Sequence, residues 1–289
     1  MNEHRIRLPG GRTLAAAEVG DPDGTPLFLF HGFPGSRLGV QLAHEEAQRQ
    51  GVRLIALDRP GWGQSDPLRG RRLHDWPADL TAAADRLHCD RFNVLGLSGG
   101  APFSLASAAA VPDRIGRVGV LCGLGPVAAM RKGDGMIWHN RLGLKLASRA
   151  RWLVGPALIV AAPLLRHLSG FAIDNLTRHS GAADRAALSD PWVRQVFGRE
   201  FREGFRSGAG AAVDARIYGA AWDLDFAAIV PPVFLWHGEA DTIVPVSMAR
   251  WVADKIPDVH PTYYPGEGHF SVVLNHLPEI VEVMRVRPA

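Results

Sequence analysis

The length, composition and charge of the chain exclude several classes of protein. Of its 289 residues, 47% are hydrophobic and 21% charged, so the chain can bury a large core and is expected to be neither disordered nor a coiled coil. The formal net charge is only +3 and the basic residues are scattered, whereas nucleic-acid binding requires a basic stripe. We therefore expect no nucleic-acid partner.

Cysteine usage and the N-terminal sequence indicate where the protein works. The two cysteines, Cys89 and Cys122, lack the spacing of a metal site, and we expect both to be buried thiols in a reducing compartment. The N-terminal residues lack the apolar core of a signal peptide. These features predict a cytoplasmic protein that holds no metal and no cofactor.

Strands and helices alternate along the first part of the chain. Two opening strands are predicted at 4–8 and 12–19, and the continuous apolar run 26–30 predicts a strand buried on both faces, as in a parallel sheet. The next predicted elements are a helix from Ser36 to about residue 50, a strand at 52–57, a helix at 75–87, a strand ending at Ser98, a further helix, and a strand at 115–122. This alternation indicates a mostly parallel sheet covered by helices on both faces.

The alternation stops between about residues 125 and 225. This segment has no convincing strand but has helix-length stretches, at 136–150, 156–168, 182–188, 191–205 and 210–221. Alternation then resumes with a strand at 232–237, a helix at 246–256, a strand at 260–264 and a final helix at 272–285. We predict an α/β core made of residues 1–124 and 226–289, interrupted by a helical cap at 125–225.

The serine Ser98 stands where an apolar strand turns sharply into a helix. The pattern Gly96-x-Ser98-x-Gly100 occurs once in the chain, between the strand at 92–97 and a small-residue helix with Pro102 in its first turn. Glycines at these positions let the strand and the helix approach closely, and the turn displays the serine hydroxyl above the sheet. We therefore choose Ser98 as the candidate nucleophile.

A serine nucleophile needs a base, and the base needs an acid to orient it. In a strand-turn-helix site of this kind the chain order is serine, acid, histidine. Asp241 follows the strand at 232–237, and His269 follows the strand at 260–264, so both are expected at the same sheet edge as Ser98. We assign Ser98 as nucleophile, His269 as general base and then acid, and Asp241 as the residue that orients the imidazole.

Other residues near these strand ends could fill the same roles. Glu239 and Glu267 compete for the acid, but solvated loop carboxylates are their favoured identity. His31 and His237 end apolar strands and are interpreted as hydrogen-bonded turn residues.

The tetrahedral oxyanion of acyl transfer needs preformed donors. The backbone N–H of Gly99, directly after the serine, supplies one, and the N–H of Phe33, in the loop after the strand at 26–30, is predicted to supply the second. An apolar cover over the pocket is the alternative role of Phe33.

Taken together, these motifs resemble the α/β-hydrolase fold superfamily, in its esterase, lipase and epoxide-hydrolase-like branch. The residues that carry the resemblance are His31-Gly32-Phe33-Pro34-Gly35, Asp58-Arg59-Pro60-Gly61-Trp62-Gly63-Gln64-Ser65-Asp66, Gly96-Leu97-Ser98-Gly99-Gly100, Gly238-Glu239-Ala240-Asp241 and Gly268-His269-Phe270. The resemblance implies an α/β-hydrolase fold, with a mostly parallel eight-stranded sheet flanked by helices and a helical cap. It implies a serine hydrolase that cleaves carboxylic esters through an acyl-enzyme on Ser98.

Several other activities stay open. Epoxide hydrolases and haloalkane dehalogenases of this fold carry an aspartate at the elbow, so Ser98 argues against both. The same triad also serves thioesters, lactones, amides, carbon–carbon bond hydrolysis and perhydrolysis, and some proteins of this fold are non-hydrolytic receptors or lyases. A dinucleotide-binding oxidoreductase is suggested by the glycines at 123–128 but disfavoured, because no acid occurs from Met136 through Ile173.

The insertion suggests the substrate. Six of its aromatic residues are predicted to line an apolar pocket above the serine: Trp138, Trp152, Phe171, Trp192, Phe197 and Phe201. They point to a small-molecule substrate, a hydrophobic ester with an apolar acyl or alcohol part. The equally weighted alternative is that they attach the cap to the core.

The apolar run 152–165 is too short and too interrupted by proline and glycine to span a membrane. Basic residues flank it, at Arg131, Lys132, Arg141, Lys145, Arg149, Arg151 and Arg166. A solvated outer face is the favoured explanation, and contact with a membrane surface or an anionic substrate is the alternative. The oligomeric state is not readable from these patterns.

Overall fold

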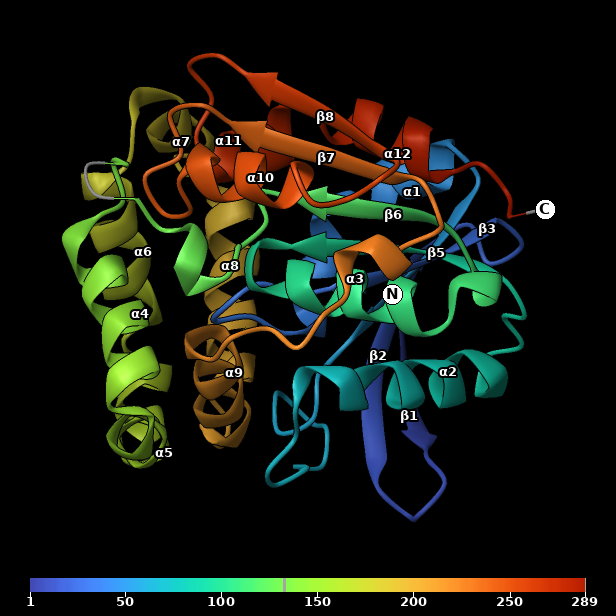
Figure 1. Cartoon of the computed structure of the whole chain (residues 1–289), viewed down its shortest axis with the longest axis horizontal. Coiled ribbons are helices and arrows are strands. Elements are labelled where there is room, and N and C mark those ends of the chain that lie inside the picture. Colours follow the sequence, from blue (N-terminus) through green and yellow to red (C-terminus); the bar gives the residue numbers. More distant parts are fainter. Residues whose placement is uncertain (132–133, 289) are drawn as a thin grey trace.

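The strands form one sheet in the computed structural model, which describes residues 1–131 and 134–288 (Figure 1). Lys132 lies outside the described residues, as does the side chain of Arg151. The strands are β1 (Asn2–Arg7), β2 (Thr13–Gly20), β3 (Thr25–Phe30), β4 (Val52–Leu57), β5 (Phe92–Leu97), β6 (Ile115–Leu121), β7 (Val233–Gly238) and β8 (Val259–Tyr264). Their order is β1-β2-β4-β3-β5-β6-β7-β8. The pairs β1–β2 and β2–β4 are antiparallel and all other pairs are parallel, which confirms the expected mostly parallel sheet.

Helices cover both faces of the sheet, as the continuous apolar strands predict. One face packs against α2 (Trp76–Arg86), α3 (Ala101–Ala110) and α10 (Val246–Ala253). The other packs against α1 (His44–Arg49), α11 (His269–Asn275) and α12 (Leu277–Met284). In β3, Phe28 and Phe30 join the first core and Leu27 the second, because neighbouring side chains of a strand point to opposite faces.

The helices between β6 and β7 gather at one end of the molecule. They are α4 (Trp138–Arg149), α5 (Arg151–His167), α6 (Ser169–His179), α7 (Ala182–Ala187), α8 (Pro191–Gly204) and α9 (Ala209–Gly219). Figure 1 shows them at the end toward which the arrowheads of β6, β7 and β8 point. The side chains of this segment therefore lie over the carboxyl ends of the strands, where Ser98, Asp241 and His269 follow β5, β7 and β8.

Several predicted helices differ from those observed. The helix after Ser36 starts with a 3-10 segment (Arg37–Ala43), which Ser36 caps by accepting the N–H of Leu38 at 3.4 Å. The single helix predicted at 272–285 is two helices, α11 and α12, and Pro278 lies in the first turn of the second, where its missing N–H costs little. Helix α5 begins before 156 and continues through Pro156, and α6 was not predicted at all. Pro156 in α5 and the Ser169-Gly170 pair in α6 resemble helix breaks in the sequence. Both α5 and α6 are nevertheless helical in the structure.

Candidate active site

Ser98 sits in a strained turn directly after β5. Its φ of +52° lies in the left-handed region, which non-glycine residues rarely adopt. The backbone oxygen of Ser98 accepts the N–H of Leu124 at 3.0 Å, which helps to hold this conformation. A Cβ on Gly96 would lie 2.6 Å from Ser104 Oγ, and one on Gly100 would lie 2.0 Å from the backbone oxygen of Phe30. The two glycines are thus required by the close approach of α3 to β5 and β3.

His269 and Asp241 form a buried pair at the ends of β8 and β7. His269 Nδ1 lies 2.6 Å from Asp241 Oδ2, while Asp241 Oδ1 accepts the backbone N–H groups of Ile243 and Val244, each at 2.8 Å. These bonds fix the carboxylate, and the carboxylate leaves His269 Nε2 as the free ring nitrogen. Burial alone would lower the pKa of His269, but the nearby carboxylate of Asp241 reverses this effect and raises the pKa above its ordinary value.

Ser98 and His269 line the same cavity, which also borders Ile243. Among the described residues, the Ser98 hydroxyl and His269 Nε2 do not form a hydrogen bond with each other. Catalytic hydrogen bonds are often long in unliganded sites and shorten when substrate binds, so the arrangement fits a nucleophile and a base.

A carboxylate of the inserted segment holds the start of the helix that carries His269. Asp184, on α7, accepts the backbone N–H groups of His269, Phe270 and Ser271 at 3.0, 2.8 and 2.9 Å. A Cβ on Gly268 would lie 2.4 Å from Asp184 Oδ2, so this glycine leaves the room that the carboxylate occupies. The negative charge of Asp184 also adds to the rise in the pKa of His269.

The loop that carries Phe33 is tied to the same inserted segment by a buried ionic network. Arg59 donates to the backbone oxygens of His31 and Gly32, at 2.5 and 3.2 Å, and its Nε lies 2.8 Å from Asp214 Oδ2 on α9. Arg71 also binds Asp214. Both side chains of the Arg59–Asp214 pair are fully buried.

Tyr218, one turn after Asp214, connects this network to the elbow. Its hydroxyl donates to the backbone oxygen of Gly99 at 2.8 Å, and its ring packs edge-on against Phe33, with centroids 5.6 Å apart. The backbone N–H groups of Phe33 and Gly99 are predicted to bind an oxyanion. Both therefore belong to segments that contact the same helix, α9.

The alternative acids and histidines lie in other surroundings. Glu239 pairs with Arg250 at 2.6 Å on the surface, and Glu267 contacts Asn275 at 3.1 Å. His31 and His237 are buried, and each hydrogen-bonds a backbone oxygen, that of Gly32 at 2.9 Å and that of Val244 at 2.8 Å.

Two cavities meet at Ser98, and both also border Phe33, Asn140 and Ile243. The larger cavity, of about 250 Å³, runs under α4, α5 and α9; its further walls are Gly99, Leu124, His139, Gly143, Leu144, Ala147, Val154, Leu158, Ala215, Tyr218 and Val244. The smaller, of about 190 Å³, runs under α6 and α8; its further walls are Gly32, Pro34, Leu97, Ile173, Leu176, Leu188, Phe197, Glu200, Phe201, His269, Phe270 and Val273. A ligand bound at Ser98 can therefore extend into both cavities.

The six aromatic residues predicted to line the pocket fall into two groups. Phe197 and Phe201 line the smaller cavity. The other four face outward and border neither cavity: Trp138 and Trp152 are each 72% exposed, Phe171 64% and Trp192 48%. They lie on the helices α4, α5, α6 and α8, and other residues of these helices line the two cavities.

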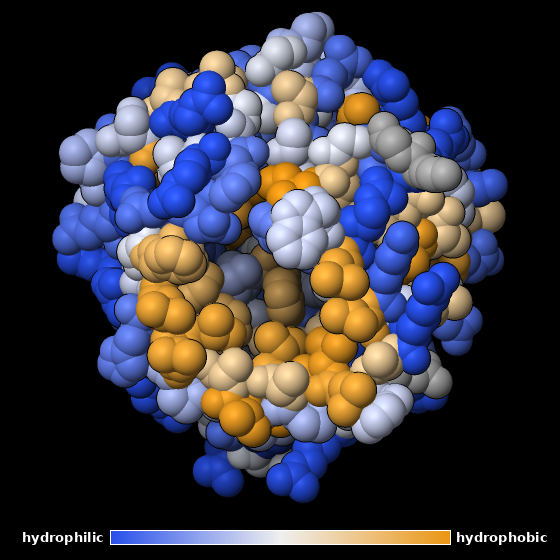
Figure 2. Space-filling model, turned by 90° about the vertical axis from the view of Figure 1, so that its left-hand side faces the viewer, coloured by the Kyte–Doolittle hydropathy of each residue, from blue (hydrophilic) through white to orange (hydrophobic). Residues whose placement is uncertain are grey.

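The outer face of α4, α5 and α6 exposes further large apolar side chains. Besides the tryptophans and Phe171, these are Leu142, Leu146, Leu153, Ile159, Val160, Leu164 and Leu168. Figure 2 shows apolar side chains beside a hollow on this face, with hydrophilic ones farther out. In the described part of the chain, only the helix pair 152–167 and 169–179 has the length and composition of a membrane span, and it is bent by 91°.

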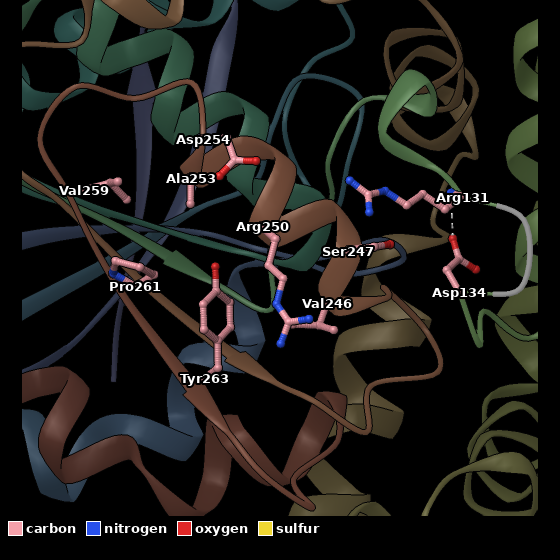
Figure 3. Close-up of a pocket in the computed structure, with 10 residues that line it drawn as sticks. All are labelled: Arg131, Asp134, Val246, Ser247, Arg250, Ala253, Asp254, Val259, Pro261 and Tyr263. Carbon is pink, nitrogen blue, oxygen red and sulfur yellow. Dashed lines mark hydrogen bonds between the residues drawn. The ribbon is translucent and has the colours of Figure 1, made fainter.

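Two other features of the structure do not belong to this site. Cys122 lies close to Asp241 and His269, but burial and the neighbouring carboxylate raise the pKa of its thiol well above the ordinary value, so the thiolate that binds metals is disfavoured. A wider hollow of about 730 Å³ lies between α10, β8 and the segment that contains Arg131 and Asp134 (Figure 3). None of the predicted site residues borders this hollow.

Four buried polar residues of the inserted segment were not predicted to serve the site: Asp184, Glu200, Asp214 and Tyr218. Asp214 had a signal in the sequence, because it is a lone carboxylate among small apolar residues of a predicted helix and such a group is normally paired. Asp184 had a similar signal, as the lone carboxylate of the alanine-rich predicted helix 182–188, whereas Glu200 stands among charged residues in the sequence and had none.

The chain matches the family model described as alpha/beta hydrolase fold over residues 25–275. Among curated proteins it is 29% identical over 269 residues to the dihydrolipoyllysine-residue acetyltransferase component of an acetoin cleaving system from Pseudomonas putida, a match that covers 90% of this chain and 62% of that protein. It is also 28% identical to a monoacylglycerol lipase from Mycolicibacterium smegmatis, over 93% of this chain and 90% of the lipase.

Among solved structures, the chain resembles a bromoperoxidase from Bacillus anthracis. The TM-score is 0.72 and the identity 18%, with 98% of both chains covered. A structural similarity at such a low sequence identity supports the fold alone.

Proposed function

Since the chain belongs to the α/β-hydrolase family, we propose that it is a serine hydrolase that cleaves a carboxylic ester with a hydrophobic part. The observation that carries the proposal is the buried Asp241–His269 pair, 2.6 Å apart, whose imidazole shares a cavity with the strained residue Ser98. The similarity to a monoacylglycerol lipase over nearly the whole chain supports an ester substrate. The apolar walls of both cavities support a hydrophobic one.

The proposed reaction proceeds through an acyl-enzyme. Ser98 Oγ attacks the carbonyl carbon while His269 Nε2 takes the hydroxyl proton, and Asp241 stabilises the imidazolium. The backbone N–H groups of Phe33 and Gly99 stabilise the oxyanion, a contribution of about 3 kcal/mol for each donor. When the C–O bond breaks, His269 returns the proton to the leaving alcohol. A water molecule, deprotonated by His269, then releases the acid from Ser98.

The same residues can act on related substrates. Thioesters, lactones, amides, carbon–carbon bonds and peracid formation all pass through attack by a serine or a water activated by the same histidine, and these reactions are alternatives to ester cleavage. A receptor or lyase on the same fold is the alternative from another class.

Turnover of a chromogenic butyrate ester, together with labelling by a fluorophosphonate, tests the proposal. We expect steady hydrolysis and the label on Ser98, with neither in the Ser98→Ala variant. A panel of thioesters, lactones and amides assayed in parallel ranks the alternative bonds. If the fluorophosphonate does not label the protein and no member of the panel is turned over, the protein is a receptor or lyase and the proposal is wrong.

A further inference from the structure

The smaller cavity contains one buried carboxyl group that the proposed reaction does not use. Glu200 on α8 is only 8% exposed, yet it lies in the cavity wall together with Ser98 and His269. Its Oε1 accepts the backbone N–H of Ser36 at 3.3 Å, and this is its one hydrogen bond among the described residues. The second carboxyl oxygen, Oε2, has no hydrogen bond among the described residues, and the residue borders the cavity.

No described arginine forms an ion pair with this group, although two lie in the same region. Arg37 is bound to Asp58, Glu3 and Glu203. Arg59 is bound to Asp214 and to two backbone oxygens.

A buried carboxyl group without such partners lowers stability. Burial raises the pKa of Glu200 to about 8, and the nearby charge of Asp58 contributes to the rise. The room for the group is nevertheless built into the fold, because a Cβ on Gly35 or Gly39 would lie within 2.9 Å of its carboxyl atoms. A polar group kept at a cost in a substrate cavity indicates a polar contact with the substrate.

The proton path of the reaction tells which part of an ester occupies each cavity. The leaving alcohol takes its proton from His269 and must lie beside that residue. His269 borders the smaller cavity and not the larger one. The larger, mainly apolar cavity beside Gly99 is then left for the acyl chain.

We propose that Glu200 determines specificity at an alcohol subsite, where it binds a hydrogen-bond donor, a hydroxyl or an ammonium group, on the alcohol part of the ester. Apart from Asn140 and the two reacting residues, the rest of that cavity is apolar, with walls that include Leu176, Phe201 and Val273, so the donor sits at the end of a short hydrocarbon linker. This inference rests on the proposed ester hydrolysis.

Three butyrate esters that differ only at the end of the alcohol test the inference: propyl, 3-hydroxypropyl and 3-aminopropyl butyrate. We expect the protein to favour at least one of the two polar esters over the propyl ester by about tenfold in kcat/KM, the effect of one hydrogen bond. The preference should appear mainly in KM, because Glu200 contacts the alcohol and not the reacting carbonyl.

Two variants distinguish the two donors. Glu200→Met removes both polar oxygens and should abolish either preference, whereas Glu200→Gln keeps hydrogen bonding without charge. An ammonium preference is lost in both variants, and a hydroxyl preference is lost in Glu200→Met alone. Glu203→Gln, on the same helix but outside both cavities, is the matched control and should keep the preference of the unmodified protein.

Propyl butyrate turnover and the melting temperature show that each variant is folded. If propyl butyrate is hydrolysed but Glu200→Met leaves the ratios among the three esters unchanged, the subsite is wrong and the ester hydrolysis stands. If the unmodified protein prefers the propyl ester, the subsite is likewise wrong. If it hydrolyses none of the three, the proposed function fails and the subsite with it.

Discussion

Asp184 and His269 are 85 positions apart in the chain, yet the carboxylate of Asp184 accepts the backbone N–H of His269 at 3.0 Å. Asp184 belongs to the helical segment over the sheet edge and His269 to the first turn of α11, so the contact couples the inserted segment to the proposed base. A carboxylate at a helix N-terminus is stabilising, because it satisfies free N–H groups and the helix dipole. Any displacement of α7 therefore acts on the position of His269.

Asp184→Asn should change the pH dependence of the reaction. The carboxylates of Asp184 and Asp241 both raise the pKa of His269, so removing the negative charge of Asp184 lowers it. The buried neighbours His237 and Cys122 stay uncharged and do not offset this change. Activity requires neutral His269, so the ascending limb of kcat/KM against pH should move to lower pH. Unfolding in urea should become easier by about 1 kcal/mol, as for other helix caps.

Asp190→Asn is the control for this change. Asp190 caps α8 by accepting the N–H groups of Trp192 and Val193, at 2.7 and 3.1 Å, and lies in the same segment. It should cost less stability than Asp184→Asn, because asparagine keeps the one oxygen, Oδ1, that accepts both bonds, and it should leave the pH profile unchanged. If the ascending limb of kcat/KM against pH does not move in Asp184→Asn, then Asp184 contributes to folding alone.

Ser98→Ala should abolish ester turnover while the fold persists. Loss of a serine nucleophile has lowered kcat by about 10⁶ in another serine hydrolase, and the missing hydroxyl has no structural partner among the described residues. Ser107→Ala removes a buried hydroxyl that bonds the backbone oxygen of Phe103 at 2.7 Å on the same helix, and serves as the control. Comparable activity in the two variants, measured with a chromogenic ester, would rule out the assigned nucleophile.

Asp214→Asn should destabilise the protein strongly. The change leaves Arg59 and Arg71 buried without their common counter-ion, and breaking such a pair typically costs about 3–5 kcal/mol. Asp174→Asn removes an exposed partner of Arg194 and should cost less than about 1 kcal/mol. Urea denaturation followed by circular dichroism measures both, and equal losses would show that the buried network contributes little.

The exposed apolar face makes the hypothesis of membrane contact testable. Trp138 and Trp152 lie on helices that also carry Arg141, Lys145 and Arg166, a combination that suits the surface of anionic lipid. Membrane contact predicts co-sedimentation with phosphatidylglycerol vesicles that weakens in high salt and in the double variant Trp138→Ser, Trp152→Ser. Equal recovery with and without vesicles would leave this face as a solvated surface or a contact between copies.

The local sequence determined the parts of the protein that depend on neighbouring residues. Short apolar runs such as 26–30 marked the buried strands, and the glycines around Ser98 marked a turn that only small residues permit. The order of Ser98, Asp241 and His269 at strand ends indicated that they share one sheet edge, because the ends of parallel strands meet there. Each of these inferences needs only the repeat of a strand or the geometry of a turn.

Only the tertiary structure decided which faces of the inserted helices point inward. Both Trp138 and Phe201 are aromatic residues on helices, yet one is exposed and the other borders the cavity, since the packing of α4 and α8 on their neighbours sets each helix rotation. The same packing brings Asp184 to His269, Asp214 to Arg59, and Glu200 into the cavity beside Ser98. These contacts join residues far apart in the chain, and no local pattern encodes them because their energy comes from burial and pairing that exist only after the helices dock on the sheet.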